Sequence, residues 1–399
     1  MTTQPRFIQI HTLHSYPAAL INRDDAGLAK RLPLGNAMRT RISSQCLKRH
    51  WRIADDRFAL SELAVPMAIR SRGTLELIHK RIVEGGVAER LAQAAVEALR
   101  NGGLVDRAGK EMKGNEALKT GQAVLMGKAE IDYLVGRCVD LAQASADDTA
   151  LRAAVAKMLK DEKKNIEALK HGSGLESALF GRMVTSDVLA SRDAAVYVAH
   201  AFTVHEAQVE NDYFTVVDDL LEESGELGSA GIFDTELASG LYYGYAVVDV
   251  RQLIENLEGI EAKDCFSAKT PPEKRELAGK VVEHLLHLIA TVSPGAKRGS
   301  TAPFDWAKLM LVEVGDWQPR SLAGAFHDAL PLSAKDGRTI RERAVACLSE
   351  EIAKMDGAYG ATLSRRVMAL DPAEMPNAQR LDLSGLGAWA AETIAEGAC

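Results

Sequence analysis

A cluster of basic residues near the N-terminus is the strongest candidate for a binding site in this sequence. Between Asp25 and Asp55 no acidic residue occurs, yet the segment holds Lys30, Arg31, Arg39, Arg41, Lys48, Arg49 and Arg52. The whole chain is acidic, with a formal net charge of -7, so this concentration of positive charge is local. Positive charge gathered in one segment is typical of a site for a phosphate-bearing ligand.

The second half of this segment predicts a helix. Ser43 or Ser44 is a good N-cap, and a helix from residue 45 onward places Leu47, Trp51 and Ala54 on one face. The outward face then carries Gln45, Lys48, Arg49 and Arg52. Serine hydroxyls, free N–H groups at the helix start and cations together suit a phosphate, and RNA backbone is the ligand we expect. The alternative is a solvated basic face without a ligand.

A second acid-free window covers residues 284–304 and contains the loop SPGAKRGSTAP at residues 293–303. Glycines, prolines and hydroxyls surround Lys297 and Arg298 there, and a flexible cationic loop of this kind can wrap a phosphate chain. An ordinary surface connection with two incidental charges is equally compatible with the pattern. The spacing is not that of a Walker loop, so it gives no support to nucleotide hydrolysis.

Two acidic pairs raise the possibility of a metal-dependent nuclease. Paired carboxylates can hold magnesium against a phosphodiester, and the chain has such pairs at Asp24 with Asp25 and at Asp218 with Asp219. Adjacent aspartates point apart on a strand, and Asp25 could simply cap a short helix at residues 26–32, so a structural role is favoured. His11 and His14 would face opposite sides of a strand. We therefore expect no catalytic residue, metal or cofactor.

Met183, in the sequence GRMVTS beside Arg182, has two interpretations. Such a methionine usually fills a core, but beside an arginine it could wedge against a nucleobase.

Composition and spacing place these residues in a globular protein. Five cysteines lie far apart without paired spacing, and no segment resembles a signal peptide or membrane span, so we expect a cytoplasmic protein with no membrane partner. Strand patterns at residues 6–14, 241–250 and 308–314 alternate with helical patterns at 75–100, 149–170 and 277–292. This order predicts an α+β sandwich of the RRM or ferredoxin type, with a helical insertion and a helical tail at residues 339–398.

Several short segments resemble CasC, the backbone subunit of the type I-E CRISPR Cascade complex. They are INRDD at residues 21–25, RISSQCLKR at 41–49, GRMVTS at 181–186, YFTVVDDL at 213–220 and SPGAKR at 293–298. The resemblance covers residues 7 to about 305. The chain departs from the family in carrying Cys46, His50 and Trp51 within the basic helix.

The resemblance implies a hand-shaped protein with an RRM-like palm, helical fingers and a thumb formed by an extended hairpin. The expected boundaries are palm at residues 1–65, 179–208 and 241–335, fingers at 66–178, thumb at 209–240 and a C-terminal helical segment at 336–399.

The resemblance also implies a function. Copies would stack head to tail along a CRISPR RNA, beside other Cascade subunits, and present the guide to target DNA; such stacking gives an open filament. The RNA-binding residues would be Arg23, Arg41, Ser43, Gln45, Lys48, Arg49, Arg52, Arg182, Met183, Thr215, Lys297 and Arg298. The main alternative is a nuclease of the type III backbone kind that uses Asp24 or Asp25.

Overall fold

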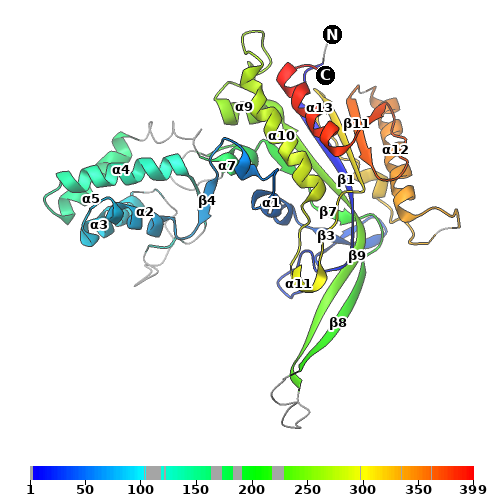
Figure 1. The fold of residues 1–399 in the computed structure, drawn as a ribbon, viewed down its shortest axis with the longest axis horizontal. Helices are drawn as coiled ribbons and strands as arrows, with labels where there is room; N and C mark the ends of the chain where they lie inside the picture. Colours follow the sequence, from blue (N-terminus) through cyan, green and yellow to red (C-terminus); the bar gives the residue numbers. More distant parts are fainter. Residues whose placement is uncertain are drawn as a thin grey trace. The chain divides into compact units, whose positions relative to one another are not determined.

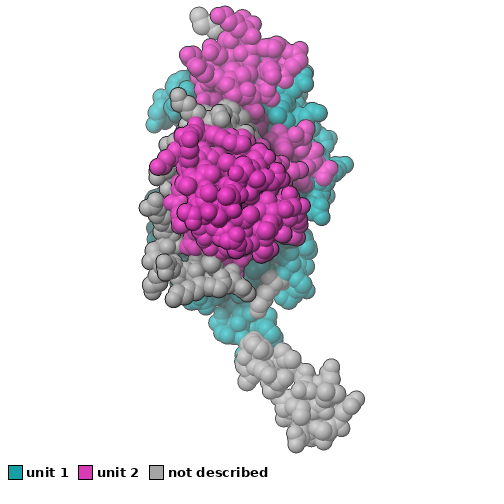
Figure 2. Space-filling model, turned by 90° about the vertical axis from the view of Figure 1, so that its left-hand side faces the viewer, with its two compact units in different colours: residues 1–59, 197–250, 275–399 teal, residues 60–196, 251–274 magenta. Residues whose placement is uncertain are grey.

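The computed structural model describes residues 3–102, 104, 118–120, 123–162, 173–182, 191–217, 229–296, 298–333, 335–360 and 362–399. The chain divides into two compact units (Figure 2). Unit 1 comprises Met1–Ala59, Tyr197–Val250 and Arg275–Cys399, and unit 2 comprises Leu60–Val196 and Arg251–Lys274. None of the helices within these described ranges has the length and apolar character needed to cross a membrane.

Unit 1 is built around four antiparallel strands in the order β10-β1-β9-β7. These strands are β1 (Phe7–Ala19), β7 (Ala201–Thr203), β9 (Ser229–Asp249) and β10 (Leu309–Gly315). Helix α1 (Ser44–Arg52) lies between β1 and β7 in the chain, and α10 (Glu273–Thr291) lies between β9 and β10. Numbered along the chain, the strand order is 4-1-3-2, which is the split βαβ arrangement of the ferredoxin type. The α+β fold predicted from the sequence is confirmed.

Further strands extend this sheet at both edges. Strands β11 (Ser364–Ala369) and β12 (Ala378–Arg380) follow β10, while β3 (Ala37–Ile42) and β2 (Arg31–Leu34) follow β7. The tail predicted as helical at residues 339–398 holds the helices α12 (Ile340–Tyr359) and α13 (Leu383–Glu396), but the strands β11 and β12, which were not predicted, separate them. The inward face of β11 carries a buried Arg365, so the apolar alternation that indicates a strand is interrupted.

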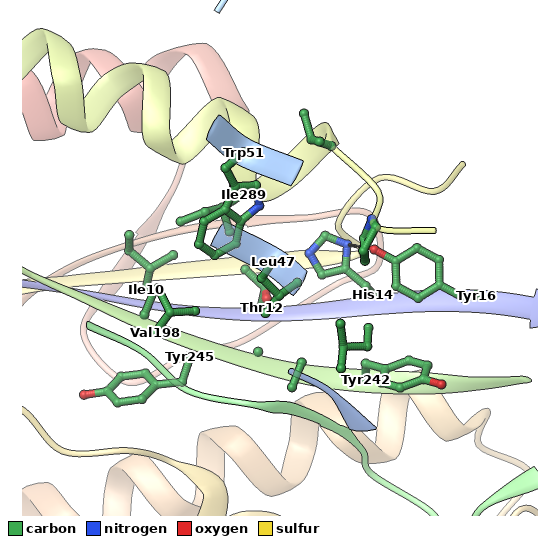
Figure 3. Close-up of a pocket in the computed structure, with 16 residues that line it drawn as sticks. Ile10, Thr12, His14, Tyr16, Leu47, Trp51, Val198, Tyr242, Tyr245 and Ile289 are labelled. Carbon is green, nitrogen blue, oxygen red and sulfur yellow. Dashed lines mark hydrogen bonds between the residues drawn. The ribbon is translucent and has the colours of Figure 1, made fainter. Parts of the chain in front are cut away.

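Both faces of the sheet are covered by helices. On one face, Leu47 and Trp51 of α1 and Ile289 of α10 pack over the strands (Figure 3). On the other face, Leu348 of α12 and Phe326 of the 3-10 helix η4 (Ala323–Phe326) belong to one buried cluster with the strands. Helix α13 lies against α10 (Figure 1), where an added Cβ at Gly279 would approach the Ala391 carbonyl oxygen to 2.8 Å.

A two-stranded ribbon extends from the sheet of unit 1 (Figure 1). Strand β8 (Gln208–Val217) pairs antiparallel with the first part of β9, from Gln208 opposite Ser239 to Val217 opposite Ser229. The second part of β9 pairs with β1. The pairing lies almost entirely within residues 209–240, where a thumb hairpin was predicted, and residues 218–228 lie outside the described chain.

Unit 2 is mainly helical. Its elements are α2 (Thr74–Glu84), α3 (Glu89–Asn101), α4 (Lys128–Ala144), α5 (Asp148–Asp161), α7 (Leu175–Phe180), the 3-10 turn η1 (Leu60–Glu62) and the pair β4 (Ala68–Ser71) and β5 (Val124–Gly127), with α9 (Val250–Glu258) beginning at the end of unit 1. The helical pattern at residues 75–100 forms two helices, because the chain turns at Gly86, whose φ of 87° suits glycine. The pattern at 149–170 corresponds to α5, and residues 163–170 lie outside the description. Helices α2 to α5 share one apolar core.

Candidate nucleic-acid interface

The predicted basic helix is present as α1. Ser43 is its N-cap and accepts a hydrogen bond from the Cys46 N–H at 3.3 Å. Trp51 is buried on the inner face, whereas Gln45 and Arg49 are exposed. The helix ends at Arg52, one residue before Ile53, so Ala54 lies beyond it. The apolar face predicted from the sequence is therefore the face that α1 packs against the sheet, and Gln45 and Arg49 of the predicted polar face are exposed.

The N–H groups at the start of α1 are less available than the sequence suggested. The Ser43 N–H donates to Asn22 Oδ1 at 2.9 Å, and the Ser44 N–H donates to His200 Nδ1 at 2.9 Å. With Cys46 bonded to the Ser43 hydroxyl, three of the first four N–H groups have partners. Only the Gln45 N–H has none among the described residues. A phosphate at this end would therefore be held mainly by cations.

The structure separates the basic residues of this segment into two groups. Arg39 is fully buried, where it donates to the carbonyls of Thr203 at 3.0 Å and Phe326 at 3.1 Å. Arg31 forms an ion pair with the buried Glu236. These two arginines stabilise the sheet edge and are not candidates for a ligand.

The remaining cations converge on α1, as their effects on neighbouring groups indicate. Burial lowers the pKa of His200, and the charges of Arg41 and Lys30 lower it further. Burial also lowers the pKa of His50, with Arg298 and Arg49 adding to the effect. Lys48 is half-buried on α1, and desolvation lowers its pKa. The site therefore combines cations from the turn before β2, from β3, from α1 and from the distant loop.

The loop at residues 293–303 is anchored beside α1. The Gly295 N–H donates to His50 Nε2 at 3.4 Å, and the Ala296 N–H donates to the Leu20 carbonyl at 2.9 Å. Arg298 begins the short helix α11 (Arg298–Thr301) and is exposed. Lys297 lies outside the described residues. Two segments singled out separately in the sequence thus belong to one surface.

Beneath α1 there is a small cavity of about 30 Å³ (Figure 3). His14 and Tyr16 of β1 line it together with Leu47 and Trp51 of α1. Desolvation lowers the pKa of His14 to about 4, so this side chain is neutral at neutral pH. A cavity of this size holds about one water molecule, so it is too small for a ligand.

The aspartate pair near the N-terminus has a structural use. Asp24 Oδ1 accepts hydrogen bonds from the N–H groups of Ala26 at 3.0 Å and Leu28 at 2.9 Å, which closes a turn. The short helix considered at residues 26–32 is therefore absent, and β2 follows the turn. Arg23 and Asp25 are exposed on either side of Asp24. Asp218 and Asp219 lie outside the described residues. Among the residues that the structure describes, no three His, Cys, Asp or Glu side chains gather to hold a metal ion.

The other expected RNA contacts fall on unit 2 and on the ribbon. Arg182 is buried, and its guanidinium donates to both oxygens of Glu130 at 2.6 and 2.8 Å. The guanidinium is thus turned to α4 in this structure, and the RNA contact expected of Arg182 stays a prediction. The Thr215 backbone pairs with Ile232 in the ribbon, and Met183 lies outside the described residues.

Three residues that organise this surface were not predicted from the sequence: Asn22, His50 and His200. Each accepts a hydrogen bond from a backbone N–H: Asn22 from the N-cap Ser43, His200 from Ser44 of α1, and His50 from Gly295 of the loop. An isolated histidine or asparagine carries no sequence signal for such a role, because the partner lies far away in the chain.

Two solved structures share this fold. The chain is similar to a chain of a solved "CRISPR RNA-guided surveillance complex, pre-nicking", with 27% identity and a TM-score of 0.76 over 96% of this chain and 100% of that chain. A chain of a second "CRISPR RNA-guided surveillance complex" shares the fold at 24% identity, with a TM-score of 0.66 over 96% of this chain and 99% of that chain.

The family itself is defined by sequence. The chain belongs to the CT1975-like protein family, whose sequence model matches residues 8–392. Among curated proteins none matches the chain.

Proposed function

We propose that this chain binds CRISPR RNA as a backbone subunit of a Cascade surveillance complex of type I-E. In this proposal copies stack head to tail along the guide RNA, associate with other Cascade subunits and present the guide to target DNA. Family membership and the full-length similarity to a chain of a CRISPR RNA-guided complex support it. The observation that carries it is the exposed cationic surface that α1 forms with the anchored loop at residues 293–303.

The chemistry of this surface favours binding to the RNA backbone. Arg41, Lys48, Arg49 and Arg298 offer cations, and their neighbours Arg23 and Lys30 lie on the turn before β2. Phosphate contacts fix the position of a strand without reading its bases. A guide of any sequence can then be held in the same way, with its bases left to pair with target.

The proposal includes no catalysis by this chain. Asp24 is engaged in its turn, so a nuclease of the alternative kind would depend on the exposed Asp25. We expect purified protein with magnesium to leave RNA paired to the guide intact. Regular cleavage fragments that disappear in Asp25→Ala would establish the nuclease instead.

The direct test is a double substitution on α1. Lys48→Ala with Arg49→Ala removes two cations, so affinity for single-stranded RNA should fall about 10- to 100-fold at physiological salt, evenly across sequences. The slope of log affinity against log salt should become shallower by about 1.4, at about 0.7 for each lost phosphate contact.

The matched control removes the same charge elsewhere. Lys263 and Lys354 are exposed and sit in surface ion pairs with Glu261 and Glu350. Lys263→Ala with Lys354→Ala should leave RNA binding nearly unchanged. Equal losses in the two double variants would mean that net charge alone attracts RNA, and the proposed site would be rejected.

Assembly provides a separate test. The mass of complexes formed on RNAs of increasing length should rise by one protomer for each fixed increment of RNA. Protein purified after expression with its operon should also carry bound RNA, which its ultraviolet absorbance spectrum would reveal. A single protomer bound regardless of RNA length would contradict the backbone role.

A further inference from the structure

His50 joins the two cationic segments of the interface through one imidazole ring. Its side chain is buried, and Nδ1 lies 2.8 Å from the Cys46 carbonyl oxygen of its own helix. A carbonyl only accepts, so Nδ1 carries the proton and donates. The opposite nitrogen, Nε2, then accepts the Gly295 N–H at 3.4 Å.

We propose that His50 is a positioning residue of the RNA site: it fixes Arg298 relative to Arg49, so that the loop and α1 bind phosphates as one unit. The inference rests on the proposed function. It adds that Arg298 and Arg49 contact RNA, whereas His50 holds them in position without contacting RNA itself.

The geometry of the loop explains why this bridge matters. Backbone and hydroxyl bonds hold the start of this loop: the Ser293 hydroxyl bonds to the Asp305 backbone at 2.8 Å, and the Ala296 N–H donates to the Leu20 carbonyl at 2.9 Å. Gly295 passes so close to Pro303 that an added Cβ would lie 2.4 Å from the proline Cγ. The bond from the Gly295 N–H to His50 Nε2 connects this part of the loop to α1.

The charges around His50 favour the form that the bridge requires. Burial, Arg298 of α11 and Arg49 of α1 lower the pKa of His50, against a hydrogen bond to the Cys46 carbonyl that raises it. The Cys46 Sγ lies 3.7 Å from Nδ1, and burial raises the pKa of that thiol, so it adds no negative charge. The ring is therefore neutral and retains an acceptor for Gly295.

A double-mutant cycle separates positioning from direct contact. In the wild type, Arg298→Ala should lower RNA affinity about 5- to 10-fold, as expected for loss of one charged phosphate contact. In a His50→Leu background the same change should cost less than about twofold, because Arg298 is no longer held in place. Arg49→Ala is the matched control and should cost the same in both backgrounds.

Rescue and backbone readouts complete the test. His50→Gln can donate to Cys46 and accept from Gly295, so it should restore most of the Arg298 effect. Hydrogen exchange without RNA should be faster at the Gly295 amide in His50→Leu and close to wild type in His50→Gln. If His50→Leu fails to fold, Gly295→Ala takes the place of His50→Leu in the cycle. Its added Cβ would clash with Pro303 and so displace the loop from His50.

The outcomes distinguish this inference from the proposed function. An equal cost of Arg298→Ala in both backgrounds, or unchanged exchange at Gly295, would overturn the positioning role while RNA binding stands. A wild-type chain that binds no RNA would overturn the proposed function itself.

Discussion

The most demanding prediction concerns Glu313, on the face of the sheet opposite α1. This carboxylate is fully buried and accepts hydrogen bonds from His11 at 3.1 Å and from Arg365 at 2.6 Å, while Arg320 binds both of its oxygens. Burial alone would raise its pKa, but the hydrogen bonds and charges of His11 and Arg320 hold the pKa of Glu313 well below the usual range. The group is ionised in the folded protein at all ordinary pH values.

Glu313→Gln keeps the shape and removes the charge. Breaking a buried ion pair from one side costs about 3–5 kcal/mol, because it leaves the other charge buried. Here Arg365 keeps Asp356 at 2.7 Å, and the Arg320 side chain is 21% exposed. We therefore expect a loss near the lower end, about 3 kcal/mol of unfolding free energy.

The pH dependence of this loss follows from the depressed pKa. The unfolded chain takes up a proton at Glu313 near pH 4.3, whereas the folded chain does so only at much lower pH. The stabilisation is therefore complete above about pH 4.3 and is lost as pH falls further. The difference in stability between wild type and Glu313→Gln should shrink on acidification.

Tryptophan fluorescence during urea unfolding measures this effect in one unit. All four tryptophans, Trp51, Trp306, Trp317 and Trp389, belong to unit 1. Glu350→Gln is the matched control, since Glu350 pairs with Lys354 on the surface and its loss should be barely measurable. RNA affinity of folded Glu313→Gln should equal that of the wild type. A stability loss below about 1 kcal/mol, or weaker RNA binding, would refute the reasoning.

Three further predictions follow from buried groups and one turn. His14→Gln should flatten the decline in unit 1 stability between about pH 6.5 and pH 4, worth up to about 3 kcal/mol, because only the unfolded chain binds a proton at His14 in that range; fluorescence-detected urea unfolding against pH tests it. Glu130→Gln should strip Arg182 of its buried partner and destabilise unit 2 by about 3–5 kcal/mol; circular dichroism should detect early helix loss while tryptophan fluorescence stays unchanged. Gly35→Ala should lower the melting temperature, because Gly35 has a φ of 58° and an added Cβ would lie 1.7 Å from the His327 carbonyl oxygen; a melting curve equal to wild type would contradict this.

Local signals explain what the sequence could predict. The N-cap Ser43 and the spacing of Leu47 and Trp51 are contained within ten residues, so α1 could be located before any tertiary structure was known. The central strands could also be located, because their buried apolar side chains form short runs that are visible in the sequence. The basic loop could be recognised, but not its position against α1: His50 and Gly295 are separated by 245 residues.

Buried polar groups and exposed strands account for most of the differences. Arg39 and Arg49 are both arginines of one basic segment. Arg39 is nevertheless buried, where it donates hydrogen bonds to the backbone carbonyls of Thr203 and Phe326, whereas Arg49 is exposed. Arg365 breaks the apolar pattern of β11 in the same way. In the ribbon, Tyr213 and Phe214 are neighbours on opposite faces and both are substantially exposed, so no buried face imposes a period of two.

The covering of the sheet bears on how RNA could be bound. In a sheet of the RRM type, aromatic side chains on the open face stack against bases. Here aromatic rings on one face of the sheet pack inside the protein: His11 stacks on Tyr245 at 4.8 Å between centroids, and the Tyr243 hydroxyl bonds to His11 at 2.9 Å and to the Leu322 N–H at 3.0 Å. Phe326 and Leu348 of α12 pack in one buried cluster with Tyr243, so within the described part of the chain these rings are covered rather than open to bases. A strand that follows the cations of α1 and the loop would meet this sheet through its phosphates, and its bases would stay free for pairing, which is the property that a guide-bearing subunit requires.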